Sequence, residues 1–332
     1  MNKTFLALAA FIFFLALADL FIYASKKTDD QSFQQEINTG YKVYSLNIPK
    51  NLNFAGEIVP INNFDVRESF DRELVQNVYF QSQTIITIKR ANRWLPVIER
   101  ILKQENIPAD FKYLAIIESN LTNVISPAGA TGFWQFLEGT GKQYGLEINE
   151  QVDERYDVER STLAACKYFK EAYACLGNWS MVAGSYNMGI TGIKKQAEMQ
   201  KTNNYYELLL NQETGRYVFR LLAMKEIFTN PQRYGYKVRK KDLYIQIPTV
   251  SHTINAPVQN LAEWAIDKGV SYKLLKLFNP WLRKNELVVI NGKKYIVKIP
   301  KNGYTNYEKL LPLFMENKLD SANYFMDTLL VQ

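Results

Sequence analysis

Glu118 is the residue whose position most strongly suggests chemistry. If residues 111–119 form a helix, one apolar stripe of that helix ends in a carboxylate, since positions i, i+3, i+4 and i+7 are Phe111, Leu114, Ala115 and Glu118. Burying a carboxylate is costly unless it is paired or takes up a proton. The pattern therefore predicts an acid that carries its proton near neutral pH. The alternative is a glutamate that faces solvent at the end of its helix, as most glutamates do.

Other catalytic residue types are scarce in the chain. It has one histidine, His252, and two cysteines, Cys166 and Cys175. A lone histidine argues against a zinc site and against Ser–His or Cys–His catalysis. Both cysteines fall in residues 161–177, which read as one helix that places them on opposite faces, too far apart for a disulfide. We expect no metal, no cofactor and two buried free thiols.

Hydroxyl, amide and aromatic groups follow Glu118 along the chain. Residues 126–130 (SPAGA) predict a tight turn, and residues 132–135 (GFWQ) put an aromatic surface beside the amide of Gln135. Tyr186 and Asn187 add a phenol and a second amide at a predicted helix end. Aromatic rings that stack and amides that hydrogen-bond are what a sugar-binding cleft requires, although each residue alone is equally typical of a core or a helix cap.

Helical periodicity covers the middle of the chain. Helices are predicted from Asp65 onward, through residues 91–102 with Pro96 in the first turns, and after Pro108. Further helices are predicted at residues 161–176 and 213–228. Between them, residues 178–189 (NWSMVAGSYNMG) predict a short helix that Ser180 caps and Gly189 ends. No stretch between residues 65 and 230 alternates as a strand would, so we expect an all-α domain.

The two ends of the chain have a different character. Residues 4–24 are almost wholly apolar and predict an export signal, with Ala16-Leu17-Ala18 as a cleavage site, or an uncleaved membrane anchor. Two predicted strands, 252–254 and 294–299, flank two short helices separated by Gly269, which predicts a small β-α-α-β module. The expected organisation is a signal peptide or anchor (1–27), an extended arm (28–64), a catalytic domain (65–232), the module with its linker (233–302) and a helical tail (303–332).

Composition limits the function only weakly. The 332 residues are 47% hydrophobic, enough for about two domains with real cores. The net charge of +7 suits an anionic polymer or a membrane surface, but the basic residues are scattered, and nothing predicts a nucleic-acid partner.

Four motifs in order resemble one enzyme family. ESN at 118–120, SPAGATGFWQF at 126–136, SYNMG at 185–189 and ETGRYV at 213–218 are similar to the family 1 lytic transglycosylases, which have a goose-lysozyme-like α fold. FAGE at 54–57 and RANRWLPVIE at 90–99 are closest to the membrane-bound type D branch of that family. The bulky Phe133-Trp134 pair departs from the commoner pattern, which would alter the surface of a sugar subsite.

The resemblance implies a reaction and a set of residues. Glu118 would be the single acid/base that cleaves the β-1,4 bond between N-acetylmuramic acid and N-acetylglucosamine in peptidoglycan, leaving a 1,6-anhydro sugar. Ser126, Gln135, Tyr186 and Asn187 would line the saccharide cleft, and Tyr217 would lie near the acid. The motifs place no second carboxylate at the cleft, unlike most glycosidases. Peptidoglycan strands in the bacterial envelope or periplasm are the implied partner, and the membrane is a second one if the N-terminal segment is uncleaved.

The C-terminal module resembles a lysin-motif (LysM) domain, which binds N-acetylglucosamine chains. Residues 270–282 and 294–300 fit that pattern, whereas residues 256–261 replace its usual Gly-Asp-Thr-Leu. Two alternatives to the transglycosylase remain open: a lysozyme-type muramidase that uses water, and a non-catalytic wall-binding protein.

Overall fold

The computed structural model describes residues 30–32, 34–35, 43–290 and 292–319. The chain divides into two compact units, residues 1–45 and 46–332, and the strands and helices between residues 52 and 315 all belong to the second. Its elements are mostly helices, with two small antiparallel sheets of two strands each among the described residues. The mainly α fold predicted from periodicity is confirmed.

A short hairpin opens the unit, within the segment that was expected to be an extended arm. Strands β1 (Leu52–Phe54) and β2 (Glu57–Val59) pair antiparallel around Ala55 and Gly56, both at positive φ. The Phe54 ring is fully buried, with its centroid 5.2 Å from that of Phe111. The Glu57 carboxylate accepts hydrogen bonds from the backbone N–H groups of Trp179 and Ser180. The hairpin therefore caps the start of the helix that begins at Trp179, rather than only lying along the helical part.

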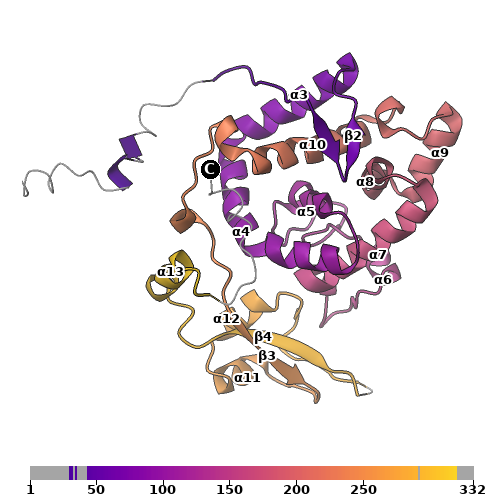
Figure 1. Cartoon of the computed structure of the whole chain (residues 1–332). Coiled ribbons are helices and arrows are strands. Elements are labelled where there is room, and N and C mark those ends of the chain that lie inside the picture. Colours follow the sequence, from indigo (N-terminus) through magenta and orange to yellow (C-terminus); the bar gives the residue numbers. More distant parts are fainter. Residues whose placement is uncertain (1–29, 33, 36–42, 291, 320–332) are drawn as a thin grey trace, which may run out of the picture. The chain divides into compact units, whose positions relative to one another are not determined.

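The helical part is built from eight α-helices. They are α3 (Phe64–Tyr79), α4 (Gln81–Gln104), α5 (Lys112–Ser119), α6 (Glu138–Gln143), α7 (Val158–Leu176), α8 (Trp179–Met188), α9 (Ile190–Gln200) and α10 (Gln212–Thr229). Single 3-10 turns lie between or after them at Ala109–Phe111, Glu154–Tyr156, Tyr205–Glu207, Pro231–Tyr234 and Lys240–Asp242. Figure 1 shows α5 enclosed by the longer helices of this part, which is why its residues Leu114, Ala115 and Ile116 are fully buried.

Two local expectations were wrong. Pro96 lies in the middle of α4, because that helix begins at Gln81, ten residues before the apolar stripe that predicted it. Ser180 does not cap α8: the Asn178 side chain accepts from the Met181 N–H, and Ser180 is inside the helix. Gly189 ends α8 as expected, at φ 84°.

The cysteine prediction was half right. Both thiols are free on one helix, α7, but only Cys166 is buried and Cys175 is exposed. The apolar face of α7 turns toward the core at Cys166, and nine residues of helix carry Cys175 away from it.

The C-terminal module has the predicted β-α-α-β order. Strand β3 (Thr249–Ile254) pairs antiparallel with β4 (Tyr295–Pro300), and α11 (Leu261–Asp267) and α12 (Tyr272–Phe278) lie between them in sequence. Leu261, Leu275 and Val297 form part of a small core of its own. Helix α13 (Tyr307–Met315) lies in the segment expected to be a helical tail, of which residues 320–332 are outside the described part.

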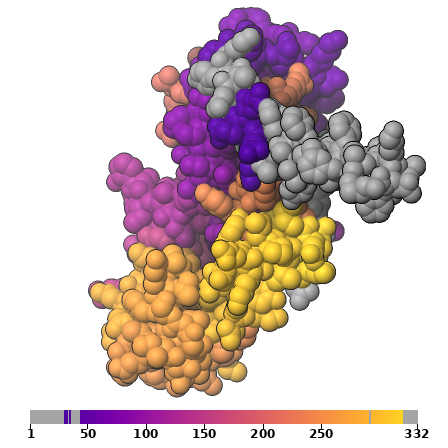
Figure 2. Space-filling model, turned by 90° about the vertical axis from the view of Figure 1, so that its left-hand side faces the viewer, coloured from indigo at the N-terminus to yellow at the C-terminus, as the bar shows by residue number. Residues whose placement is uncertain are grey.

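The loop before α7 joins this module to the helical part. Val152 and Tyr156 belong to the same core cluster as the module, and the Asp153 N–H donates to the Trp281 carbonyl at 2.9 Å. The Arg283 N–H donates in turn to the Gln151 carbonyl at 2.7 Å. In Figure 2 the orange module lies directly against the magenta residues of the helical part.

The N-terminal segment predicted as a signal or anchor, residues 1–27, lies outside the described residues. Within the residues that the structure does describe, we find no helix long and apolar enough to cross a bilayer.

Candidate active site

Glu118 stands at the C-terminal end of α5, as its stripe predicted. The helix stops immediately after it, because Asn120 and Leu121 both adopt left-handed backbone conformations, at φ 51° and 56°. The buried Ser119 hydroxyl donates to the carbonyls of Ala115 and Phe133, at 3.0 and 2.9 Å. The end of the acid helix is thereby fixed to the turn that follows it.

The Glu118 carboxyl is held in a poorly hydrated setting. Burial raises its pKa from 4.5 to about 7, while a hydrogen bond from the Tyr217 hydroxyl to Oε1 and the positive charge of Arg220 act in the opposite direction. The negative charge of Glu213 adds to the rise. An acid with a pKa of about 7 can both give and take a proton near neutral pH, which general acid–base chemistry requires.

Tyr217 reaches Glu118 from α10, which packs against α5. Its side chain is 2% exposed, and burial raises its pKa well above the usual value, so it remains a neutral donor. Its pairing with Glu118 joins two motifs that lie ninety-nine residues apart in sequence.

The turn that contains Ser126 is held by its own hydrogen bonds. The Ser126 N–H donates to the Ala130 carbonyl at 2.8 Å, and the Ser126 hydroxyl accepts from the Ala130 N–H at 3.0 Å. Gly132 has φ +84°, and a Cβ there would lie 2.0 Å from the Arg155 carbonyl oxygen. Only glycine fits at this point, because both the backbone conformation and the close approach exclude a side chain.

Gln135 closes the same turn. Its backbone is left-handed, at φ 49°, and its side-chain Nε2 donates to the carbonyls of Val124 and Gly132, at 3.0 and 2.8 Å. Both amide hydrogens are therefore used within the turn. The side-chain carbonyl oxygen is the group that Gln135 can offer to a ligand.

The expectation of an exposed aromatic surface beside Gln135 was wrong, because both rings are buried. Trp134 is 0% exposed and Phe133 is 3% exposed. The Trp134 ring packs edge-on against Phe169, and its Nε1 donates to the Thr162 hydroxyl at 2.9 Å. The pair fills the core under the turn, so its departure from the family pattern changes packing rather than a sugar-binding surface.

Tyr186 and Asn187 approach the site from the end of α8. The Tyr186 hydroxyl donates to the Trp134 carbonyl at 2.8 Å. Burial raises the pKa of Tyr186 well above its usual value, and the charge of Glu118 adds to the rise. The Asn187 side chain accepts from the Thr214 hydroxyl at 2.7 Å and donates to Glu213 at 3.3 Å. Helices α5, α8 and α10 thus bring together Glu118, Tyr186, Asn187 and Tyr217. The hydrogen bond of the Ser126 hydroxyl lies within its own turn.

Sequence reasoning missed three residues of this site. Glu213 is a second carboxylate whose charge reaches Glu118, and Arg220 is a positive charge that does the same. Glu213 stands four residues before Tyr217, so helical spacing within the ETGRYV motif could have found it. Arg155 carries no such signal, because its contacts are with residues distant in sequence.

Arg155 supports the turn from below. It is 9% exposed and pairs with both oxygens of Asp153, at 3.0 and 2.7 Å. Its Nη1 donates to the carbonyls of Gly129 and Phe136, both at 3.2 Å. Because Asp153 also contacts the C-terminal module, Arg155 links that module to the turn between residues 126 and 136.

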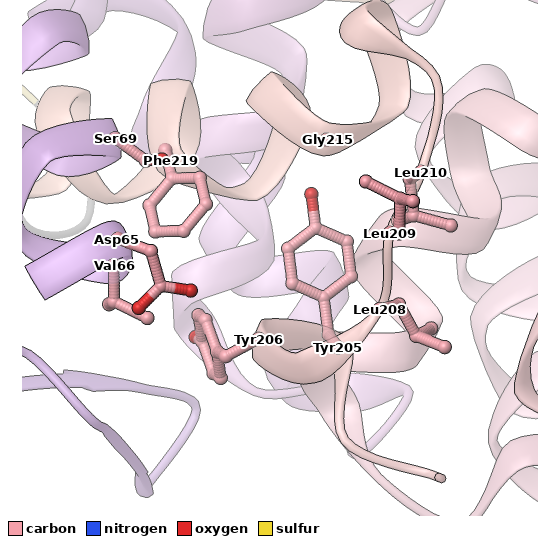
Figure 3. A pocket seen from close by; sticks show the side chains of 10 residues that line it. All are labelled: Asp65, Val66, Ser69, Tyr205, Tyr206, Leu208, Leu209, Leu210, Gly215 and Phe219. Carbon is pink, nitrogen blue, oxygen red and sulfur yellow. The ribbon is translucent and has the colours of Figure 1, made fainter. Parts of the chain in front are cut away.

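A separate pocket of about 160 Å³ lies on the other side of α10. Gly215 and Phe219 line it, together with Tyr205, Tyr206 and the start of α3, as Figure 3 shows. Residues 215 and 219 lie on the face of α10 opposite to Glu213 and Tyr217, and neither Glu118 nor Tyr217 is among the residues that line this pocket. Among the described residues no group of His, Cys, Asp or Glu could hold a metal ion.

Two stretches of the chain match models of known protein families. Residues 96–209 match the transglycosylase SLT domain. The chain contains an SLT domain. Residues 250–303 match the soluble lytic transglycosylase C-terminal LysM-like domain, so the module resemblance drawn from the sequence is also confirmed. The SLT match includes Glu118, Ser126, Gln135, Tyr186 and Asn187 and ends before Tyr217.

The curated relatives of this SLT protein come from Escherichia coli. The membrane-bound lytic murein transglycosylase D of each of two strains is 30% identical over 245 residues, which are 72% of this chain and 52% of the relative. The chain thus spans about half the length of the curated relatives it matches. Among solved structures, the 70 kDa soluble lytic transglycosylase of Escherichia coli matches 60% of this chain and 40% of its own, at 16% identity and a TM-score of 0.38.

Proposed function

We propose that the protein is a peptidoglycan lytic transglycosylase with Glu118 as its only acid/base. The observation that carries the proposal is the Glu118 carboxyl at the end of α5, which accepts a hydrogen bond from the Tyr217 hydroxyl and has a pKa of about 7. The SLT match and the lytic murein transglycosylase relatives support the same enzyme class.

The proposed bond is the β-1,4 link between N-acetylmuramic acid and N-acetylglucosamine. Protonated Glu118 gives its proton to the glycosidic oxygen as the bond from that oxygen to C1 of the muramic sugar breaks. The C6 hydroxyl oxygen then bonds to C1, and its proton passes to the Glu118 carboxylate. The products are a 1,6-anhydro sugar and a free hydroxyl on the leaving sugar, the acid is restored, and no water is consumed.

The remaining site residues would hold the strand. Ser126, the Gln135 carbonyl oxygen and the Asn187 amide are proposed to bind the polar groups of the saccharide, with the Tyr186 ring beside them. Tyr217 keeps the Glu118 carboxyl in place, because its hydroxyl donates to Oε1. Residues 65–232 would be the catalytic domain.

One observation favours a second candidate, a lysozyme-type muramidase. Most glycosidases use two carboxylates, and Glu213 is a second carboxylate near the acid. In a hydrolase it could activate a water molecule. However, Glu213 accepts a hydrogen bond from Asn187 at 3.3 Å and has no buried setting of its own, which makes it a better partner for Asn187 than a base.

The rest of the chain fits an envelope enzyme. Residues 1–27 are proposed to export the protein to the periplasm, either as a cleaved signal or as an anchor in the membrane. The LysM-like module, residues 233–302 with its linker, is proposed to bind the same glycan strands.

Product analysis of digested peptidoglycan tests the proposal. Purified sacculi are incubated with the wild type and with Glu118→Gln, and the released muropeptides are weighed by mass spectrometry. We expect anhydro products from the wild type and none from the variant. Products heavier by one water, with reducing ends, would support the muramidase. Full activity of Glu118→Gln would refute both.

A further inference from the structure

Arg220 is the charged residue of the site whose arrangement still lacks an explanation. It follows Tyr217 by three residues on α10, and its guanidinium carbon lies 5.7 Å from the centroid of the Tyr217 ring. Its Nε is buried and has no hydrogen-bond partner among the described residues. In an exposed arginine, water would accept hydrogen bonds from all five N–H donors. The fold holds the Arg220 guanidinium near the Tyr217 ring although, within the described part of the chain, its Nε–H lacks a hydrogen bond there, which has an energetic cost.

The charges around Glu118 show which form of its carboxyl group Arg220 favours. The groups that act on Glu118 are Tyr217, Glu213 and Arg220 on α10, with Tyr186 facing it from α8. Among these described groups, Arg220 alone is positive. Glu213 repels a carboxylate at Glu118, and the two tyrosines are neutral at neutral pH.

The proposed reaction needs such a charge at one step. When Glu118 gives its proton to the glycosidic oxygen, a carboxylate forms in a site that excludes most water, where an uncompensated negative charge is costly. A cation against the face of the Tyr217 ring draws electron density from that ring and makes its hydroxyl a stronger donor. That hydroxyl is the one that donates to Glu118.

We propose that Arg220 is a positioning residue that acts through Tyr217 to stabilise the carboxylate formed at Glu118 when the glycosidic bond breaks. This inference rests on the proposed function. It also makes a claim about the free protein, because the same charge acts on Glu118 before any substrate binds.

The experiment compares neutral and charged replacements of Arg220. Arg220→Met and Arg220→Gln remove the charge, Arg220→Lys keeps it, and Arg67→Met removes an exposed arginine of α3 as the control. Titration of the glutamate carboxyl carbons is followed by ¹³C NMR in the free proteins, with Glu118 assigned from its absence in Glu118→Gln. Initial rates on sacculi are measured across the same pH range.

In both neutral variants we expect the Glu118 titration, and the fall in rate on the alkaline side, to move to higher pH by at least about half a unit. The maximal rate should fall several-fold, while Arg220→Lys and Arg67→Met should titrate as the wild type does. A lower rate with an unmoved Glu118 titration would assign Arg220 a purely structural role and overturn the inference. Because two neutral variants are used, poor folding of one leaves the other to decide.

The two proposals fail in different ways. A wild type that releases no product from sacculi refutes the proposed function, whatever Glu118 does. A Glu118 titration that is the same in wild type, Arg220→Met and Arg220→Gln refutes the role of Arg220, even if the wild type is active.

Discussion

Replacing Glu118 by glutamine should stabilise the fold at alkaline pH while removing activity. The folded protein holds the Glu118 proton up to a pKa of about 7, whereas the unfolded chain releases it near 4.5. The stability that this proton contributes is complete below pH 4.5 and is lost as the pH rises through 7. The gap corresponds to about 3 kcal/mol, an upper value because the side chain keeps some exposure. A neutral glutamine avoids this loss.

Urea denaturation of both proteins at pH 4.5, 6 and 8 measures the effect. We expect the free energy of unfolding of Glu118→Gln, relative to the wild type, to increase by about 1–3 kcal/mol from pH 4.5 to pH 8. Glu150→Gln is the matched control, since Glu150 is exposed and its replacement should give a difference that does not vary with pH. A pH-independent difference for Glu118→Gln would show that this carboxyl is not desolvated in the folded protein.

Three further changes test the surroundings of the acid. Tyr217→Phe removes the hydroxyl that donates to Glu118. A hydrogen bond to a charged group contributes about 1.5–3 kcal/mol, so the pH at which the rate falls on the alkaline side should rise by about one to two units. An unchanged pH profile of the rate would exclude this contact. Arg155→Met breaks the buried pair with Asp153 and should lower the free energy of unfolding, measured in urea, by about 3–5 kcal/mol. Lys142→Met breaks an exposed pair and should lower it by less than about 1 kcal/mol. Equal losses would show that Arg155 does not support the turn. A thiol reagent should label Cys175 in the native protein, whereas Cys166, whose pKa burial raises to about 12, should react only after unfolding; mass spectrometry that finds native label on Cys166 would contradict the buried position.

The sequence was informative where a pattern is local. The stripe ending in Glu118 predicted the acid helix and its buried face, since apolar residues at helical spacing must turn toward a core. The β-α-α-β order of the C-terminal module followed equally from alternation and from Gly269.

The remainder depends on contacts between distant residues. From the sequence, Trp134 is interpreted as a ring that stacks on sugar. In the structure its side chain is buried under the turn, where its Nε1 donates to Thr162 of α7. Glu213 and Arg220 come near Glu118 only because α10 packs against α5. Arg155 supports the turn only because its loop contacts residues 129 and 136. The periodicity of the sequence does not predict these contacts, because they depend on tertiary packing.

The mass of the products released from purified sacculi tests the central claim most directly. If Glu118 is the only acid/base and the C6 hydroxyl replaces water, the wild type releases muropeptides that end in 1,6-anhydromuramic acid, and Glu118→Gln releases none. Products that each carry one additional water, or undiminished release by Glu118→Gln, would contradict the account.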